Sequence, residues 1–141
     1  MSACTFFGHR DAPDTVLAPL LHAIENLIVT EGVTAFYVGN HGAFDRHAYA
    51  ALCRLRKRYP HIRIAVVLAY MPSAKDALYG EDGLFPEGIE TVPKRFAIHY
   101  RNEWMLSHAD CVISYTPRCF GGAMHYVNKA KRQNKKLVEL Q

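Results

Sequence analysis

The sequence predicts an α/β protein with a three-layer, Rossmann-like fold, in which helices flank a mainly parallel sheet. Short apolar runs alternate with stretches of helical periodicity, at a spacing typical of parallel strands joined by crossover helices. The length of 141 residues, of which 50% are hydrophobic, supports one core and is too small for two ordinary domains. We therefore expect a single domain over residues 1–141.

The first half of the chain contains three apolar runs and two helical patterns. The first run, 4–7, is followed by apolar residues at helical spacing over 16–28. Pro19 requires that helix to begin just before it or to kink, and Gly32 is expected to end it. The next elements are a strand at 35–38, a helix over 44–59 that Pro60 ends, and a strand at 62–68.

The second half begins with a loop-like stretch, 72–93, that is rich in glycine and acidic residues, with a short strand expected near 89–92. An aromatic helix, a strand, a glycine-led helix and a final short strand complete the pattern, at 94–108, 111–115, 121–133 and 137–140. The N-terminal residues show neither the basic region nor the cleavage pattern of a signal peptide, and no run is long enough for a membrane span. We expect a cytoplasmic protein with no membrane partner.

The formal charge of +4 permits an anionic partner without requiring one. The basic residues gather at 54–58 and 129–136, where two predicted helices end. Cations at these positions complement the helix dipole and are common on solvated faces. Binding to nucleic acid would require one continuous basic face with aromatic platforms, so we do not expect a nucleic-acid partner.

Glycine-rich loops after several predicted strands indicate a ligand site. In an open α/β sheet, ligands bind beyond the carboxyl ends of the strands, where the strand order reverses. Glycines at helix starts let backbone N–H groups approach a phosphate, and an arginine matches its geometry. The candidate residues in these loops are Gly8, His9, Arg10, Gly39, Asn40, Gly42, Asp45, Thr116, Gly121, Gly122 and Ala123.

These residues suggest separate roles within one site. We expect the backbone of Gly122 and Ala123, together with Arg10, to hold a phosphate. Asn40, Asp45 and Thr116 would contact a ribose or base, on which Tyr70 or Phe44 could stack.

A metal site is the alternative interpretation of the densest polar cluster, which contains His41, Asp45 and His47. Their spacing matches no common site, and residues 45 and 47 would lie on different sides of a helix. The sequence therefore predicts no metal ligands, and no cofactor apart from a bound nucleotide.

The order Arg101-Asn102-x-x-Met105, then Ala109-Asp110, then Gly121-Gly122, resembles the SLOG superfamily, the Rossmann-like group that contains the Smf/DprA and Lonely Guy proteins. The glycine loops after the first two strands resemble its YpsA-like branch of small stand-alone bacterial proteins. The resemblance extends from Thr5 to Leu140. It implies a nucleotide-binding site at the carboxyl edge of the sheet, with Arg101 as the family arginine and as a candidate, beside Arg10, for holding the phosphate.

Lonely Guy enzymes are phosphoribohydrolases, and their motif Pro-Gly-Gly-x-Gly-Thr-x-x-Glu ends in a glutamate needed for activity. Aligned on Gly121-Gly122, that position is Tyr126 in this chain. The resemblance therefore favours a nucleotide-binding or sensor protein. A phosphoribohydrolase with a relocated carboxylate, Asp45 or Glu103, is the alternative.

The helix over 94–108 carries Phe96, Tyr100 and Trp104, more apolar surface than one face can bury. An aromatic patch of this kind usually marks a partner, so we expect a homo-oligomer.

Overall fold

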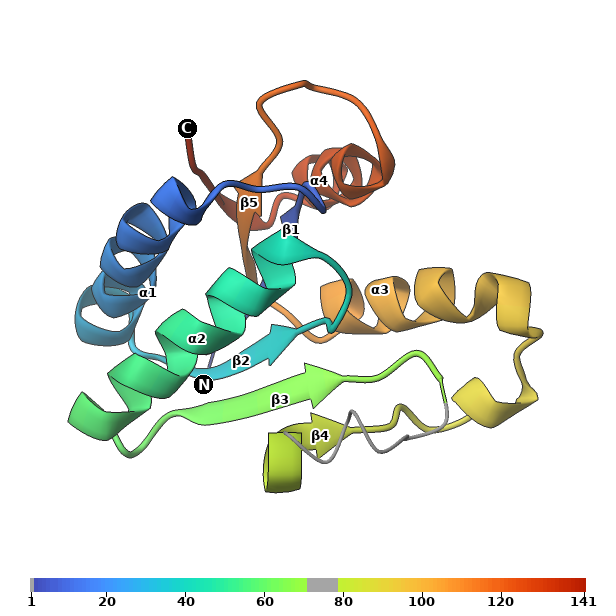
Figure 1. Cartoon of the computed structure of the whole chain (residues 1–141), viewed down its shortest axis with the longest axis horizontal. Helices are drawn as coiled ribbons and strands as arrows, with labels where there is room; N and C mark the ends of the chain where they lie inside the picture. Colours follow the sequence, from blue (N-terminus) through green and yellow to red (C-terminus); the bar gives the residue numbers. More distant parts are fainter. Residues whose placement is uncertain (1, 71–78) are drawn as a thin grey trace.

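A computed structural model describes residues 2–70 and 79–141 of the chain. Six parallel strands form one sheet in the order β4-β3-β2-β1-β5-β6 (Figure 1). Along the chain the strands are β1 (Ser2–Gly8), β2 (Val33–Val38), β3 (Arg63–Val67), β4 (Gly83–Leu84), β5 (Cys111–Tyr115) and β6 (Lys136–Glu139). Helices α1 (Leu17–Glu31) and α2 (Ala43–Arg58) cover one face, and α3 (Ala97–Ser107) and α4 (Gly122–Arg132) cover the other. The predicted three-layer α/β fold is confirmed, with a sheet that is entirely parallel.

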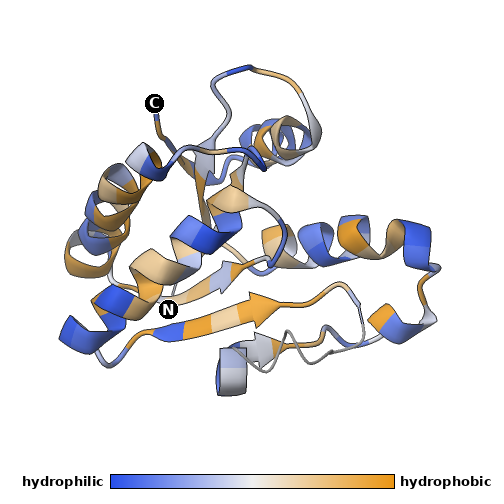
Figure 2. Ribbon diagram, viewed as in Figure 1, coloured by the Kyte–Doolittle hydropathy of each residue, from blue (hydrophilic) through white to orange (hydrophobic). Residues whose placement is uncertain are grey.

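The core has two parts, one on each face of the sheet. Consecutive strand residues point to opposite faces, so Phe6 packs in the cluster beneath α1 and α2 while Phe7 packs in the cluster beneath α3 and α4. In β5, Ile113 likewise packs beneath α1 and α2, and Val112 packs beneath α3 and α4. Strands buried on both faces account for the continuous apolar runs in the sequence. Most of β3 is apolar, whereas the C-terminal end of α2 is hydrophilic (Figure 2).

The boundaries of α1 agree with its sequence signals. The helix begins at Leu17, which puts Pro19 in the first turn, where a backbone N–H has no helical partner to lose. Gly32 ends the helix in the left-handed conformation, φ 68°, and its N–H bonds to the carbonyl of Leu27.

The strand predicted near 89–92 is wrong. Ile89–Thr91 is a 3-10 helix that follows Gly88, whose φ is 84°, and the N–H of Thr91 bonds to the carbonyl of Gly88. These local bonds satisfy the backbone without a neighbouring strand. The strand that pairs with β3 is β4, earlier in the same stretch, while residues 72–78 of the predicted loop lie outside the described residues.

The aromatic side chains near α3 find partners within the chain. The Trp104 ring lies edge-on to Tyr37, with centroids 5.3 Å apart, and stacks on His108 at 3.9 Å. The Tyr100 hydroxyl donates to the carbonyl of Glu87, and Phe96 remains exposed. Less apolar surface is thus free than the sequence suggested, and the homo-oligomer stays a prediction.

Candidate functional site

A crevice forms where the chain changes direction across the sheet. β1 and β5 are neighbours, but the chain leaves β1 toward α1 on one face and leaves β5 toward α4 on the other. The two loops therefore diverge, as expected at a topological switch point. A cavity of about 550 Å³ opens here, lined by Phe6, Phe7, Gly8, His9, Arg10, Asp11, His41, Asp45, Ile98, His99, Arg101, Asn102, Met105, Arg118, Phe120, Gly121, Gly122, Ala123 and Tyr126.

The loop after β1 is held between two neighbouring segments. The N–H of His9 donates to the carbonyl of Tyr115 at 3.0 Å, and the carbonyl of Arg10 accepts from the N–H of Ala43 at 2.7 Å. Gly8 lies so close to the Phe44 ring that a Cβ at this position would overlap it. This contact explains why the loop has glycine at position 8. The two backbone hydrogen bonds hold the loop so that the exposed Arg10 side chain lines the cavity.

His9 is buried, and its environment lowers the pKa of its imidazole. Burial is the main cause, and the nearby Arg118 charge adds to it, while Asp11 opposes both. Its Nε2 accepts a long hydrogen bond, 3.4 Å, from the Arg118 N–H. His9 therefore favours the neutral form and connects the loops after β1 and β5.

The loop after β5 leads into α4 through Gly121, whose φ of 103° is a conformation that favours glycine. Among residues 2–70 and 79–141, no side chain caps this helix start. The first N–H groups of a helix have no helical acceptor and carry the positive end of the helix dipole. Because Gly121, Gly122 and Ala123 line the cavity, this helix start can receive an anion there.

Arg118 places a second guanidinium in the cavity wall, where Asp11 balances its charge. Its guanidinium forms a two-pronged ion pair with Asp11, with N–O distances of 2.9 and 3.0 Å. This pair joins the loop after β5 to the loop after β1 across the mouth of the crevice. Phe120, with 66% of its surface exposed, adds an aromatic wall beside it.

Arg101 of α3 is 2% exposed and bonds mainly to the protein itself. Its Nη1 donates to the carbonyl of Val67 at 2.9 Å and to Oδ1 of Asn40 at 3.1 Å. Its Nε donates to Oδ1 of Asn102 at 2.8 Å, and its Nη2 lies 3.2 Å from Nδ1 of His41. The guanidinium therefore fixes the ends of β2 and β3 against α3, with one side on the cavity.

Asp45 is a half-buried carboxyl in the cavity wall. It accepts a hydrogen bond of 3.0 Å from the N–H of His41. Burial raises its pKa from 3.8 to about 6, although the charges of Arg101 and Arg10 and the His41 hydrogen bond all act in the opposite direction. A carboxyl with a pKa this near neutrality can exchange a proton at physiological pH.

Eight of the predicted site residues line the cavity: Gly8, His9, Arg10, Asp45, Arg101, Gly121, Gly122 and Ala123. Gly39, Asn40, Gly42 and Thr116 do not.

Three of those four residues support the wall from behind. A Cβ on Gly39 would lie 2.8 Å from Oδ2 of Asp45, and one on Gly42 would lie 2.8 Å from Cα of Arg10. Asn40 bonds to Arg101, and Thr116 accepts a backbone hydrogen bond from Cys119.

Neither predicted stacking residue lies in the cavity wall. Phe44 is 1% exposed and packs in the core against Phe6 and Tyr115, because its place on α2 faces the sheet. Tyr70 is exposed, lies edge-on to His41 and receives the Lys94 ammonium over its ring. The aromatic residues that do line the cavity are Phe6, Phe7, Phe120 and Tyr126.

Ile98, His99, Asn102 and Met105 of α3 also line the cavity. The glycine loops do not predict them, and the family resemblance includes Asn102 and Met105 as motif residues without a site role. Arg118 and Phe120 fall within the loop after β5, where the charge of one and the aromatic ring of the other are the sequence signals for them.

The polar cluster of the loop after β2 does not converge. His47 lies 3.3 Å from Asp14, whereas His41 and Asp45 face Arg101. Asp45 and His47 are two positions apart on α2, with one residue between them, and so point in different directions.

None of the described helices has the length and apolar character needed to span a membrane. In comparisons with known proteins, no family model matches the sequence and no curated protein is significantly similar to it.

Proposed function

We propose that the protein binds a nucleotide or a nucleotide-derived ligand in the crevice between the loops after β1 and β5, as a binding or sensor protein. The observation that carries the proposal is that the uncapped start of α4, Arg10 and Arg118 all border one cavity. Helix N–H groups and guanidinium groups are the donors that proteins use for phosphate.

The remaining walls fit the rest of such a ligand. Ile98, Met105 and Phe120 give an apolar lining suited to a base, and Asp45 and Asn102 supply oxygen acceptors suited to ribose hydroxyls. The volume of about 550 Å³ lies within the usual range for small-molecule sites. The SLOG resemblance supports the same ligand class.

Thermal unfolding with AMP, ADP-ribose, NAD and adenosine tests the proposal. We expect at least one phosphorylated ligand to raise the Tm and adenosine to raise it less. Arg10→Gln should reduce the shift, whereas Arg132→Gln should preserve it, since Arg132 is an exposed charge in the last turn of the same α4. If no phosphorylated ligand stabilises the protein at concentrations far above a plausible Kd, the proposal is wrong.

Asp45 supports a second candidate, the cleavage of the N-glycosidic bond of a nucleoside monophosphate. It is a carboxyl in the cavity wall with a pKa of about 6. Ionised, it could stabilise positive charge on the ribose or activate water. Tyr126, which stands where Lonely Guy enzymes have glutamate, contributes only a hydroxyl, placed 2.7 Å from Nδ1 of His99.

Release of free base from AMP, followed by chromatography, distinguishes the enzyme from the binding protein. For the enzyme we expect activity that falls below pH 6 and is lost in Asp45→Asn. Glu103→Gln should remain active, because Glu103 is outside the cavity lining and pairs with Lys129. Base release that is unchanged in Asp45→Asn would exclude this role for Asp45.

A further inference from the structure

We propose that His99, Glu103 and His125 form a binding site for a divalent transition metal at the junction of α3 and α4. One ligand atom from each of these side chains lies within 4.8 Å of the ligand atoms of the other two. Within residues 2–70 and 79–141, no other group of three histidine, cysteine or acidic side chains converges in this way. The argument for this site does not rest on nucleotide binding, and the sequence did not predict it.

The two helices supply the ligands in a simple way. His99 and Glu103 are four residues apart on α3, so they lie one above the other on the same face of the helix. His125 comes from the first two turns of α4, and its ring lies 6.2 Å from the ring of His99. His125 is far from His99 and Glu103 in the sequence, so only the packing of α3 against α4 brings the three side chains together.

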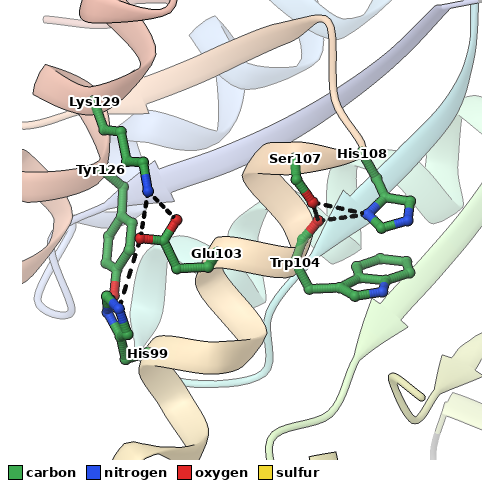
Figure 3. A network of polar contacts seen from close by, with 7 residues as sticks. All are labelled: His99, Glu103, Trp104, Ser107, His108, Tyr126 and Lys129. Carbon is green, nitrogen blue, oxygen red and sulfur yellow. Dashed lines mark hydrogen bonds and ion pairs between the residues drawn. The ribbon is translucent and has the colours of Figure 1, made fainter. Parts of the chain in front are cut away.

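Tyr126 holds the His99 ring in a useful orientation. The Tyr126 hydroxyl lies 2.7 Å from Nδ1 of His99, while Nε2 lies 3.6 Å from Oε1 of Glu103 (Figure 3). With Nδ1 engaged by the hydroxyl, Nε2 faces the carboxylate and remains available to a metal. Metal-binding histidines are commonly fixed in this way through their other ring nitrogen.

Lys129 occupies the position of a competing cation. Its Nζ lies 2.8 Å from Oε1 and 2.6 Å from Oε2 of Glu103 (Figure 3). A metal bound at Oε1 would repel this ammonium, which must then move away from at least that oxygen. The Lys129 side chain is partly exposed and can turn toward solvent.

The donor set of two imidazoles and one carboxylate selects the metal. Zn²⁺ and Co²⁺ accept nitrogen donors readily, whereas Mg²⁺ and Ca²⁺ prefer sites made of oxygen. Three protein ligands leave a fourth position for water or another ligand. His99 also lines the cavity, so the metal would lie at its rim.

Calorimetric titration of the full chain with Zn²⁺ tests the site in the absence of nucleotide, so its outcome is separate from that of nucleotide binding. We expect one equivalent to bind, and His99→Ala or His125→Ala to weaken binding by about tenfold or more. His22→Ala is the matched control, since it removes an exposed imidazole from α1, and it should leave the affinity unchanged. Both ligand histidines are exposed, so their loss should leave the metal-free Tm nearly unchanged.

Two further results sharpen the assignment. Lys129→Gln should bind Zn²⁺ several-fold more tightly than the natural protein, because the competing charge is removed. Co²⁺ should give the visible absorption of a low-symmetry site, and Glu103→Gln should change that spectrum. The proposal fails if Zn²⁺ does not bind, if the histidine variants bind as tightly as His22→Ala, or if Lys129→Gln weakens binding.

Discussion

The guanidinium of Arg101 donates a 2.9 Å hydrogen bond to the main-chain oxygen of Val67, the last residue of β3. This bond joins a helix on one face of the sheet to the carboxyl end of a strand. The same guanidinium bonds to Asn40 in the loop after β2 and lies beside Asp45 in electrostatic contact. One side chain of the cavity wall thus joins α3 to the ends of β2 and β3.

We expect Arg101→Met to destabilise the fold by about 2–4 kcal/mol, because the carbonyl and amide acceptors lose their donor in a buried place. The stability of Arg101→Lys should lie between those of the natural protein and Arg101→Met, since one ammonium cannot reach all the acceptors of a guanidinium. Urea unfolding measures both, with the exposed Arg132→Met as control. A stable Arg101→Met protein would show that the guanidinium does not hold these loops together.

Asp45 should make stability depend on pH. Its folded pKa, about 6, is above its ordinary value of 3.8, so ionising it costs the folded state more than the unfolded state. The stabilising effect of the protonated carboxyl is complete below pH 3.8 and is lost as the pH rises through 6. The difference between the two pKa values corresponds to at most about 3 kcal/mol in the free energy of unfolding. We expect a smaller effect, because the side chain is only half-buried.

Asp45→Asn cannot ionise, so its stability should rise relative to that of the natural protein between pH 4 and pH 7. The measurement is the difference in urea midpoint between the two proteins across this range. A constant difference would contradict the raised pKa.

Gly8→Ala should cost about 1–3 kcal/mol, because the added methyl group overlaps the buried Phe44 ring and forces the core to shift. Gly122→Ala is the matched control, since a Cβ there meets nothing within 4 Å in the first turn of α4. We expect that variant to be neutral or stabilised by up to about 1 kcal/mol. Equal losses of Tm in both variants would contradict a specific contact at Gly8.

Arg118→Gln should raise the pKa of His9. The Arg118 charge lowers that pKa, and the Asp11 charge, which raises it, would remain in the variant. NMR titration of the His9 imidazole measures the shift, with Arg132→Gln as the control for a change in net charge. An unchanged His9 pKa would show that the lowering comes from burial alone.

The sequence indicated much of the fold because its signals were local. Alternating apolar runs and helical spacing identified strands buried on both faces, and Pro19 and Gly32 located the ends of α1. The strand predicted near 89–92 was wrong because Gly88 starts a turn whose hydrogen bonds are local. The strand that does form in this stretch, β4, has only two residues, which is too short to show a strand periodicity in the sequence. Phe44 was misjudged because a helical pattern does not show which aromatic side chain faces the sheet.

By itself, the sequence determined the fold class, and eight of the residues that it singled out line the cavity. These follow from chain order, since the carboxyl ends of parallel strands meet at one edge. Only the tertiary structure decided that Arg101 forms its hydrogen bonds mainly within the protein and that Arg118 pairs with Asp11. It also decided that His99, Glu103 and His125 converge. The reason is physical: these contacts join distant segments, and their distances depend on how the two helix layers pack on the sheet.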